Sequence, residues 1–162
     1  MKLYLTSLLV VLTALSAFAQ PAAGPATKTF DELAGTALAA MSKRAEELKI
    51  KGVGLVAFVE GDTVKSWSSK MVVVGSLKND PTQKDRGSNL LGIAYSKASE
   101  MADTLKDSGH AGRPAMTGET GWQGGLIKKV KAGYLIAAFS GGPSESDVKV
   151  SQAGLDALAD KL

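Results

Sequence analysis

The side chains with the clearest chemical potential in this sequence lie in one glycine-rich segment, residues 107–125. This segment, DSGHAGRPAMTGETGWQGG, contains the only histidine of the chain, His110, and also Arg113, Met116 and Trp122. A neutral imidazole can ligate a haem iron, and a methionine can supply the ligand on the other side. A guanidinium can pair with a carboxylate such as a propionate, and an indole can line a pocket. The segment therefore predicts a ligand-binding loop, with His110 as its candidate metal ligand.

A structural interpretation of the same residues also fits the sequence. His110 and Arg113 can be ordinary solvated loop residues, and Trp122 can close the edge of a sheet as part of the core. The chain contains no cysteine, which excludes disulfides, thiolate nucleophiles and cysteine zinc sites. With one histidine there is no HExxH zinc motif, and no catalytic residue is recognisable.

A second feature is the segment SGGPSESD, residues 140–147, which lies between an apolar run and an amphipathic one. Its two glycines permit a sharp exit from a strand, and its proline suits the start of a helix. Ser144 and Asp147 resemble a capping box in which Asp replaces Glu. The N–H groups of such a helix start can also hold a carboxylate or phosphate, although no nucleotide-binding glycine motif is present. Capping is sufficient to explain the segment, and anion binding stays open.

The hydrophobic pattern predicts three helices and four strands that must position these two features. Helices are expected at 30–49, 88–106 and 144–162, and strands at 53–60, 63–75, 126–130 and 133–140. The first two strands form a hairpin around Gly61-Asp62, and residues 76–87 form a surface loop. This order predicts a single α+β domain, an antiparallel sheet packed by helices.

The second expected helix, from a cap at Ser88 or Asn89 to about residue 106, has the cleanest periodicity. Its apolar stripe consists of Leu91, Ala94, Ala98, Met101 and Leu105. Lys97, Glu100 and Asp103 fall off that stripe, and we expect them on a solvated face.

The N-terminus predicts export. Residues 1–19 combine Lys2, a short apolar run and a small-x-small cleavage site, the features of a signal peptide, with no retained membrane anchor. Residues 20–29 are expected to be a flexible lead-in, and residues 30–162 the folded domain. We expect a secreted or periplasmic protein. Its formal charge of +3, without dense basic runs, does not indicate a nucleic-acid partner.

Four segments resemble, in the same order, the GlcG/HbpS-like family of small haem-binding bacterial proteins. They are VGLVAFVE, GSNLLGIAYSKASEMA, the GG at 124–125 and GYLIAAFSGGPSESDVKVSQAGLDAL. The most specific parts are Ala94 with Lys97-Ala98, and Ser140-Gly141-Gly142 with Asp147. The resemblance implies a profilin-like fold that often forms homo-oligomers and binds haem or a related tetrapyrrole in some members.

The resemblance also implies roles for particular residues. The Ser-Gly-Gly turn and Lys97 would be framework elements, and the loop 107–125 would be the pocket wall. Lys97 would neutralise a ligand carboxylate, or would be a surface lysine. The leading hypothesis is an exported haem-binding module. The alternatives are a haem-degrading or small-organic-acid-processing enzyme and an oligomeric accessory protein of a sensing system.

Overall fold

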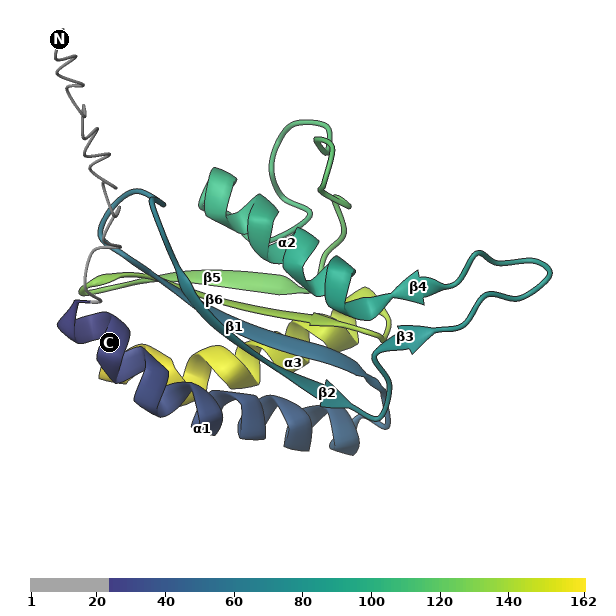
Figure 1. The fold of residues 1–162 in the computed structure, drawn as a ribbon, viewed down its shortest axis with the longest axis horizontal. Coiled ribbons are helices and arrows are strands. Elements are labelled where there is room, and N and C mark those ends of the chain that lie inside the picture. Colours follow the sequence, from purple (N-terminus) through teal and green to yellow (C-terminus); the bar gives the residue numbers. More distant parts are fainter. Residues whose placement is uncertain (1–23) are drawn as a thin grey trace, which may run out of the picture.

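The computed structural model describes residues 24–162, so the expected signal peptide at 1–19 lies outside the described residues. Three helices and six strands follow one another as α1, β1, β2, β3, β4, α2, β5, β6 and α3 (Figure 1). Their bounds are α1 Pro25–Glu47, β1 Gly52–Glu60, β2 Ser68–Val74, β3 Lys78–Asn79, β4 Ser88–Asn89, α2 Leu90–Thr104, β5 Gly125–Val130, β6 Gly133–Ser140 and α3 Ser144–Leu158, with a 3₁₀ turn at Ala159–Lys161.

The main sheet has four antiparallel strands in the order β2-β1-β6-β5. The two central strands pair in register from Val53 opposite Ser140 to Glu60 opposite Gly133. Both strands are almost entirely buried, because helices cover both faces of the sheet, and this explains their continuous apolar sequences. The predicted α+β fold with an antiparallel sheet is therefore confirmed.

The domain has three layers. Helices α1 and α3 lie side by side on one face of the sheet, and α2 alone lies on the other (Figure 1). The first face buries a core that includes Phe30, Met41, Phe58 and Phe139, while Ala94, Ala98 and Met101 of α2 pack on the second face. None of the helices in the part of the chain from residue 24 onward has the length and apolarity to cross a bilayer.

Helix α1 begins at Pro25 and not at Phe30, so residues 25–29 of the expected flexible lead-in are helical. Proline is well suited to the first helical position because its missing N–H has no partner there in any case. Thr27 also donates a 2.8 Å hydrogen bond from its hydroxyl to Glu60 at the end of β1, which ties the first turn to the sheet. Composition alone does not reveal this long-range contact.

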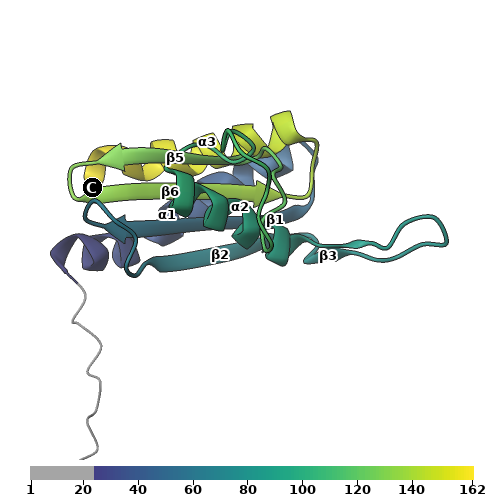
Figure 2. The same ribbon diagram turned by 90° about the horizontal axis from the view of Figure 1, so that it is seen from above.

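The expected surface loop at 76–87 contains part of a two-stranded ribbon. Strand β3 pairs with β4 through Lys78 opposite Asn89 and Asn79 opposite Ser88, and the ribbon projects away from the three layers (Figures 1 and 2). These strands are too short and too polar to leave an alternating pattern in the sequence. Asn89 then caps α2 by accepting a 3.0 Å hydrogen bond from the Gly92 N–H, as one of the two predicted caps.

The prediction of a solvated face on α2 is wrong for two of its three residues. Asp103 is exposed, but Lys97 is only 2% exposed and Glu100 only 1%. The hydrophobic pattern shows only that these residues are polar. Their partners come from other parts of the chain: Gly109, in the segment between α2 and β5, bonds to Glu100, and Phe139 of β6 and Asp147 of α3 bond to Lys97. These two buried polar residues mark the region where the candidate site is found.

Candidate functional site

The glycine-rich segment begins by docking against the outer edge of β5. The Ser108 N–H donates to the Gly125 carbonyl at 3.2 Å, and the Gly125 N–H donates back to the Ser108 hydroxyl at 2.8 Å. Asp107 accepts a further hydrogen bond of 2.9 Å from the Ile127 N–H. These contacts cover edge groups of the strand that would otherwise be unpaired. The segment is irregular, as predicted, but its start is fixed to the sheet.

The middle of the segment is held by Arg113. Its guanidinium lies 2.7 and 2.8 Å from the two carboxylate oxygens of Glu119, and 2.6 Å from a carboxylate oxygen of Asp103. Hydrogen bonds from Arg113, and then from the Met116 N–H, lower the pKa of Glu119 to about 2. Arg113, expected as a propionate partner, is thus already paired with two carboxylates of its own chain.

Beneath this segment lies the carboxyl group of Glu100. Its Oε1 accepts a 2.7 Å hydrogen bond from the Gly109 N–H, while its Oε2 is buried and has no hydrogen-bond partner among residues 24–162. Glu100 and Arg113 line a depression of about 400 Å³ together with small loop residues. Glu100 is the single contribution of α2 to this lining.

A buried ion pair joins α2 to the start of α3. The Lys97 ammonium donates to the Phe139 carbonyl at 2.7 Å and to Asp147 Oδ2 at 2.9 Å, while Asp147 Oδ1 accepts from the Gly142 N–H at 2.9 Å. Burial raises the pKa of Asp147, and the opposing effects of the Lys97 charge and of the backbone N–H groups only partly offset it. Lys97 is therefore not a surface lysine.

The same contacts show whether the Ser-Gly-Gly turn caps the helix or binds an anion. The residue preceding the helix is Pro143, without a side-chain cap, so the predicted capping role of Ser144 is wrong. Asp147 instead reaches back from within the first turns to the backbone of Gly142. The turn does bind an anionic group, but that group is a carboxylate of the same helix.

Trp122 lies beside this ion pair at the end of the glycine-rich segment. It is 54% exposed and lines a depression of about 200 Å³ together with Lys97, Ser140 and Asp147. Trp122 is thus not a core residue.

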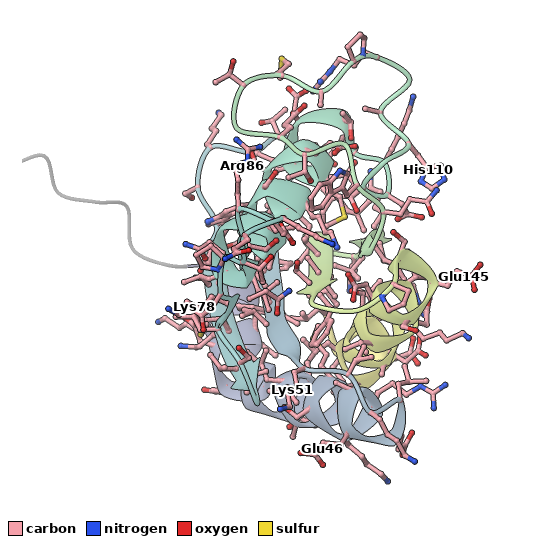
Figure 3. All side chains as sticks on the ribbon, turned by 90° about the vertical axis from the view of Figure 1, so that its right-hand side faces the viewer. Glu46, Lys51, Lys78, Arg86, His110 and Glu145 are labelled. Carbon is pink, nitrogen blue, oxygen red and sulfur yellow. The ribbon has the colours of Figure 1, made fainter. Side chains whose placement is uncertain are left out.

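His110 lies at the outer boundary of the molecule, where its side chain is exposed (Figure 3). It borders a depression of about 390 Å³ with Leu105, Lys106, Asp107 and Ile127. Leu105 is 41% exposed and Ile127 is partly buried, so both present apolar surface beside the imidazole.

The predicted cofactor-binding residues do not meet in a single depression. Lys97 and Trp122 share one, whereas Arg113 and His110 border two others. Met116 is 51% exposed on the loop. Within residues 24–162 no group of three or more His, Asp or Glu side chains is placed to hold a metal ion. The cofactor roles of these five residues, and His110 as metal ligand, remain predictions.

The sequence interpretation missed Glu100 and the pairing of Asp147 with Lys97. The sequence does contain a signal that Glu100 could be buried. A glycine-dense segment directly follows its helix, and such a segment can pack close to the helix and cover a side chain on it. For Asp147 the signal is weaker, since its partner is 50 positions away in the sequence.

Among solved structures, this fold matches that of PduOC in complex with haem. The TM-score is 0.52 with 16% sequence identity, and the match covers 77% of this chain and 91% of that one. HbpS matches with a TM-score of 0.45 and 19% identity, over 78% of this chain and 87% of HbpS. The Klebsiella pneumoniae protein ORFY matches with a TM-score of 0.45 and 18% identity, over 81% of this chain and 90% of ORFY. Neither a family model nor a curated protein matches the sequence.

The layers and the sheet order define an α+β domain with the fold of PduOC. The α+β fold that the predicted resemblance implied is therefore confirmed.

Proposed function

We propose that this protein is a binding module for haem or a related tetrapyrrole. The observation that carries the proposal is the fold shared with PduOC, a protein crystallised with haem. Because a fold does not define a ligand, the proposal also needs residues on this chain that suit one.

The surface around His110 has the required types of group. The imidazole is exposed, and no hydrogen bond from its ring occurs within the described part of the chain, so a ring nitrogen is open to an iron. Leu105 and Ile127 offer apolar contact, and the Lys106 ammonium can neutralise a propionate. This donor set would hold haem through the His110 imidazole, with Lys106 taking the place first expected for Arg113.

One subunit offers a porphyrin only one side of a pocket. Small-molecule sites usually bury 70–90% of a ligand's surface, and His110 borders an exposed surface rather than an enclosed slot. We therefore propose that a second copy of the chain covers the other face of the ring. Light scattering with and without hemin tests this, since haem-dependent or constitutive dimers support it and a haem-bound monomer contradicts it.

Hemin titration, followed by the Soret absorbance of the purified protein, tests the function itself. We expect a saturable red-shifted band in the wild type, a different spectrum for His110→Ala and weaker binding for Lys106→Gln. Lys84→Gln, in the exposed connection between β3 and β4, serves as the matched control and should bind as the wild type does. A wild-type spectrum equal to that of free hemin would reject haem binding, whereas an unchanged His110→Ala spectrum would reject only the ligand.

A reductant distinguishes binding from catalysis. If the protein is a binding module, ascorbate added to the haem complex leaves the porphyrin bands intact, and their loss together with released iron would favour the haem-degrading alternative.

We also propose that the protein is exported after cleavage before Gln20. The signal-peptide pattern of residues 1–19 supports this. Mass spectrometry of the protein from envelope and medium fractions should find a mature N-terminus at Gln20. A full-length chain confined to the cytoplasmic fraction would contradict export.

A further inference from the structure

Trp122 and the Ser-Gly-Gly turn border a depression that haem binding at His110 does not use. It lies at one end of the sheet, where the base of the ribbon, the start of α2 and the turn from β6 to α3 come together (Figure 1). Its volume of about 200 Å³ is below the roughly 300–1,000 Å³ of sites for drug-sized molecules. A ligand that fits this depression therefore has about one ring.

One side of the depression is apolar. Trp122 is 54% exposed, so much of its indole is accessible, and the half-buried Ile93 of α2 also belongs to the lining. The backbone N–H of Trp122 bonds to Thr120, whereas its indole N–H donates no hydrogen bond to any residue from 24 to 162. An indole in this state can pack against the flat face of a ring and donate a hydrogen bond at the edge of its own.

The rim of the depression carries polar groups without charge. Asn79 of β3 and Gln123 of the glycine-rich segment contribute exposed carboxamides, and Ser144 of α3 contributes an exposed hydroxyl. None of these three side chains forms a hydrogen bond within the described part of the chain. A carboxamide donates as well as accepts, as a hydroxyl does, so each group matches a hydroxyl on a ligand.

Ser140 supplies a further hydroxyl, at the base of the depression. It lies opposite Val53 in the sheet, and the Val53 side chain belongs to the core under α2, so the Ser140 side chain is on that same face. Ser140 is only 4% exposed, and its hydroxyl has no hydrogen-bond partner among residues 24–162. Unlike the Ser96 hydroxyl, which is fully buried, it keeps some accessible surface in the depression. A hydroxyl of a ligand is therefore able to reach it.

The charges in the lining favour a neutral ligand. Lys97 and Asp147 are the only charged residues there, and they neutralise each other across 2.9 Å. The polar groups come from several elements and surround the depression, so they suit a ligand whose hydroxyls point in several directions. A sugar in its pyranose form has such hydroxyls, together with an apolar C–H face that can lie on an indole.

We propose that this depression binds one pyranose sugar unit, whose C–H face packs on Trp122 and whose hydroxyls bond to Gln123 and Ser140. The unit is either a free monosaccharide or the end of a glycan, since both present the same ring. This site is separate from the His110 surface and does not depend on haem. It gives Trp122 a role other than the one first expected for it at a haem.

NMR titration of the purified protein tests this, with D-glucose, D-galactose and N-acetyl-D-glucosamine as probes and the Gly141 backbone amide, in the lining, as reporter. We expect a saturable shift with at least one of these sugars and none with D-glucitol, which has the hydroxyls but no ring. Trp122→Ala should raise the Kd by about tenfold or more, because the stacking surface is lost. Ser140→Ala, which removes one hydrogen bond, should raise it by about two- to tenfold.

Met116→Ala is the matched control, because Met116 is 51% exposed on the same segment but does not line the depression. It should bind the sugar as the wild type does. Maltose distinguishes the two sources: tighter binding than D-glucose supports a glycan end, and equal binding supports a free sugar.

Three results would overturn the proposal. The first is no saturable Gly141 shift in the wild type with any of the three monosaccharides, and the second is a response to D-glucitol equal to that of the best sugar. The third is an unchanged Kd in Trp122→Ala, a variant whose folding is not at risk because the side chain is exposed. A saturable shift with adenine in the absence of one with the sugars would overturn it as well, and would assign the depression to a planar heterocycle.

Discussion

Removing one charge from the buried pair of Lys97 and Asp147 should strongly destabilise the fold. Asp147→Asn keeps the side-chain shape and can still accept from the Gly142 N–H, but it leaves the Lys97 ammonium, which is 2% exposed, without a counter-charge. Breaking a buried pair in this way costs about 3–5 kcal/mol. That is a large part of the 5–15 kcal/mol by which domains are usually stable.

Urea unfolding at neutral pH measures this effect. With a slope of about 1–3 kcal/mol per molar urea, the midpoint of Asp147→Asn should fall by about 1 M or more. The exposed pair of Arg44 and Glu47, whose side chains are 39% and 47% exposed, provides the control. Arg44→Gln should leave the midpoint essentially unchanged, because solvent already screens that pair.

A double-mutant cycle then separates pairing from packing. Lys97→Met alone leaves Asp147 buried without its cation, whereas Lys97→Met with Asp147→Asn removes both charges. We expect the double variant to be more stable than the two single effects predict, by about 2–3 kcal/mol of coupling free energy. Additive effects, with an Asp147→Asn midpoint no lower than that of Arg44→Gln, would refute the view that this pair acts as one buried unit.

Two further predictions concern the loop and the glycines. The pKa of Glu119, lowered to about 2 chiefly by Arg113, means that its stabilisation of the loop is present above the ordinary value of 4.5 and is lost as pH falls toward 2. A carboxyl NMR titration should show this low midpoint and its return toward 4.5 in Arg113→Gln, and equal midpoints would count against the pairing. Gly124→Ala should destabilise, because a Cβ there would overlap the Lys97 ammonium at a φ of +130°. Gly35→Ala in the open interior of α1 should stabilise by about 0.5–1 kcal/mol. In thermal unfolding, a Gly124→Ala that melts no lower than the wild type, or a Gly35→Ala that melts no higher, would contradict the corresponding argument.

The sheet and its helices were predictable because buried strands and helices have recognisable apolar patterns in the sequence. The continuous apolar runs in 53–60 and 133–140 indicated strands, and the structure places both at the centre of the sheet, where helices cover both of its faces. Asn89 was recognisable as a cap because its role depends on a residue only three positions away. A local sequence pattern is thus sufficient to predict an element or a cap whose interactions involve residues close together in the sequence.

The candidate sites were less predictable because their contacts link distant parts of the chain. Helical spacing placed Lys97 and Glu100 away from the apolar stripe, and that spacing carries no information about what packs over them. Asp147 seemed to belong to a local cap, but its carboxylate is shared between the Gly142 backbone and a lysine from another helix. Ser144, the expected cap residue, does not cap the helix because it is already the first helical residue.

The position of Asp147 also determines where an anionic ligand is able to bind. Its carboxylate already accepts from the Ser-Gly-Gly turn and from Lys97, the two donors that the sequence offered to a ligand carboxylate. A propionate entering the adjacent 200 Å³ depression would meet a resident negative charge and no free cation from this pair. Arg113 is similarly occupied by Glu119 and Asp103. The surface beside His110 also has a carboxylate, Asp107, which accepts a hydrogen bond from the Ile127 N–H, but it has in addition Lys106, a cation for which no ion pair occurs among residues 24–162. A propionate therefore finds an unpaired cation there and none from Lys97 or Arg113 in the other two depressions.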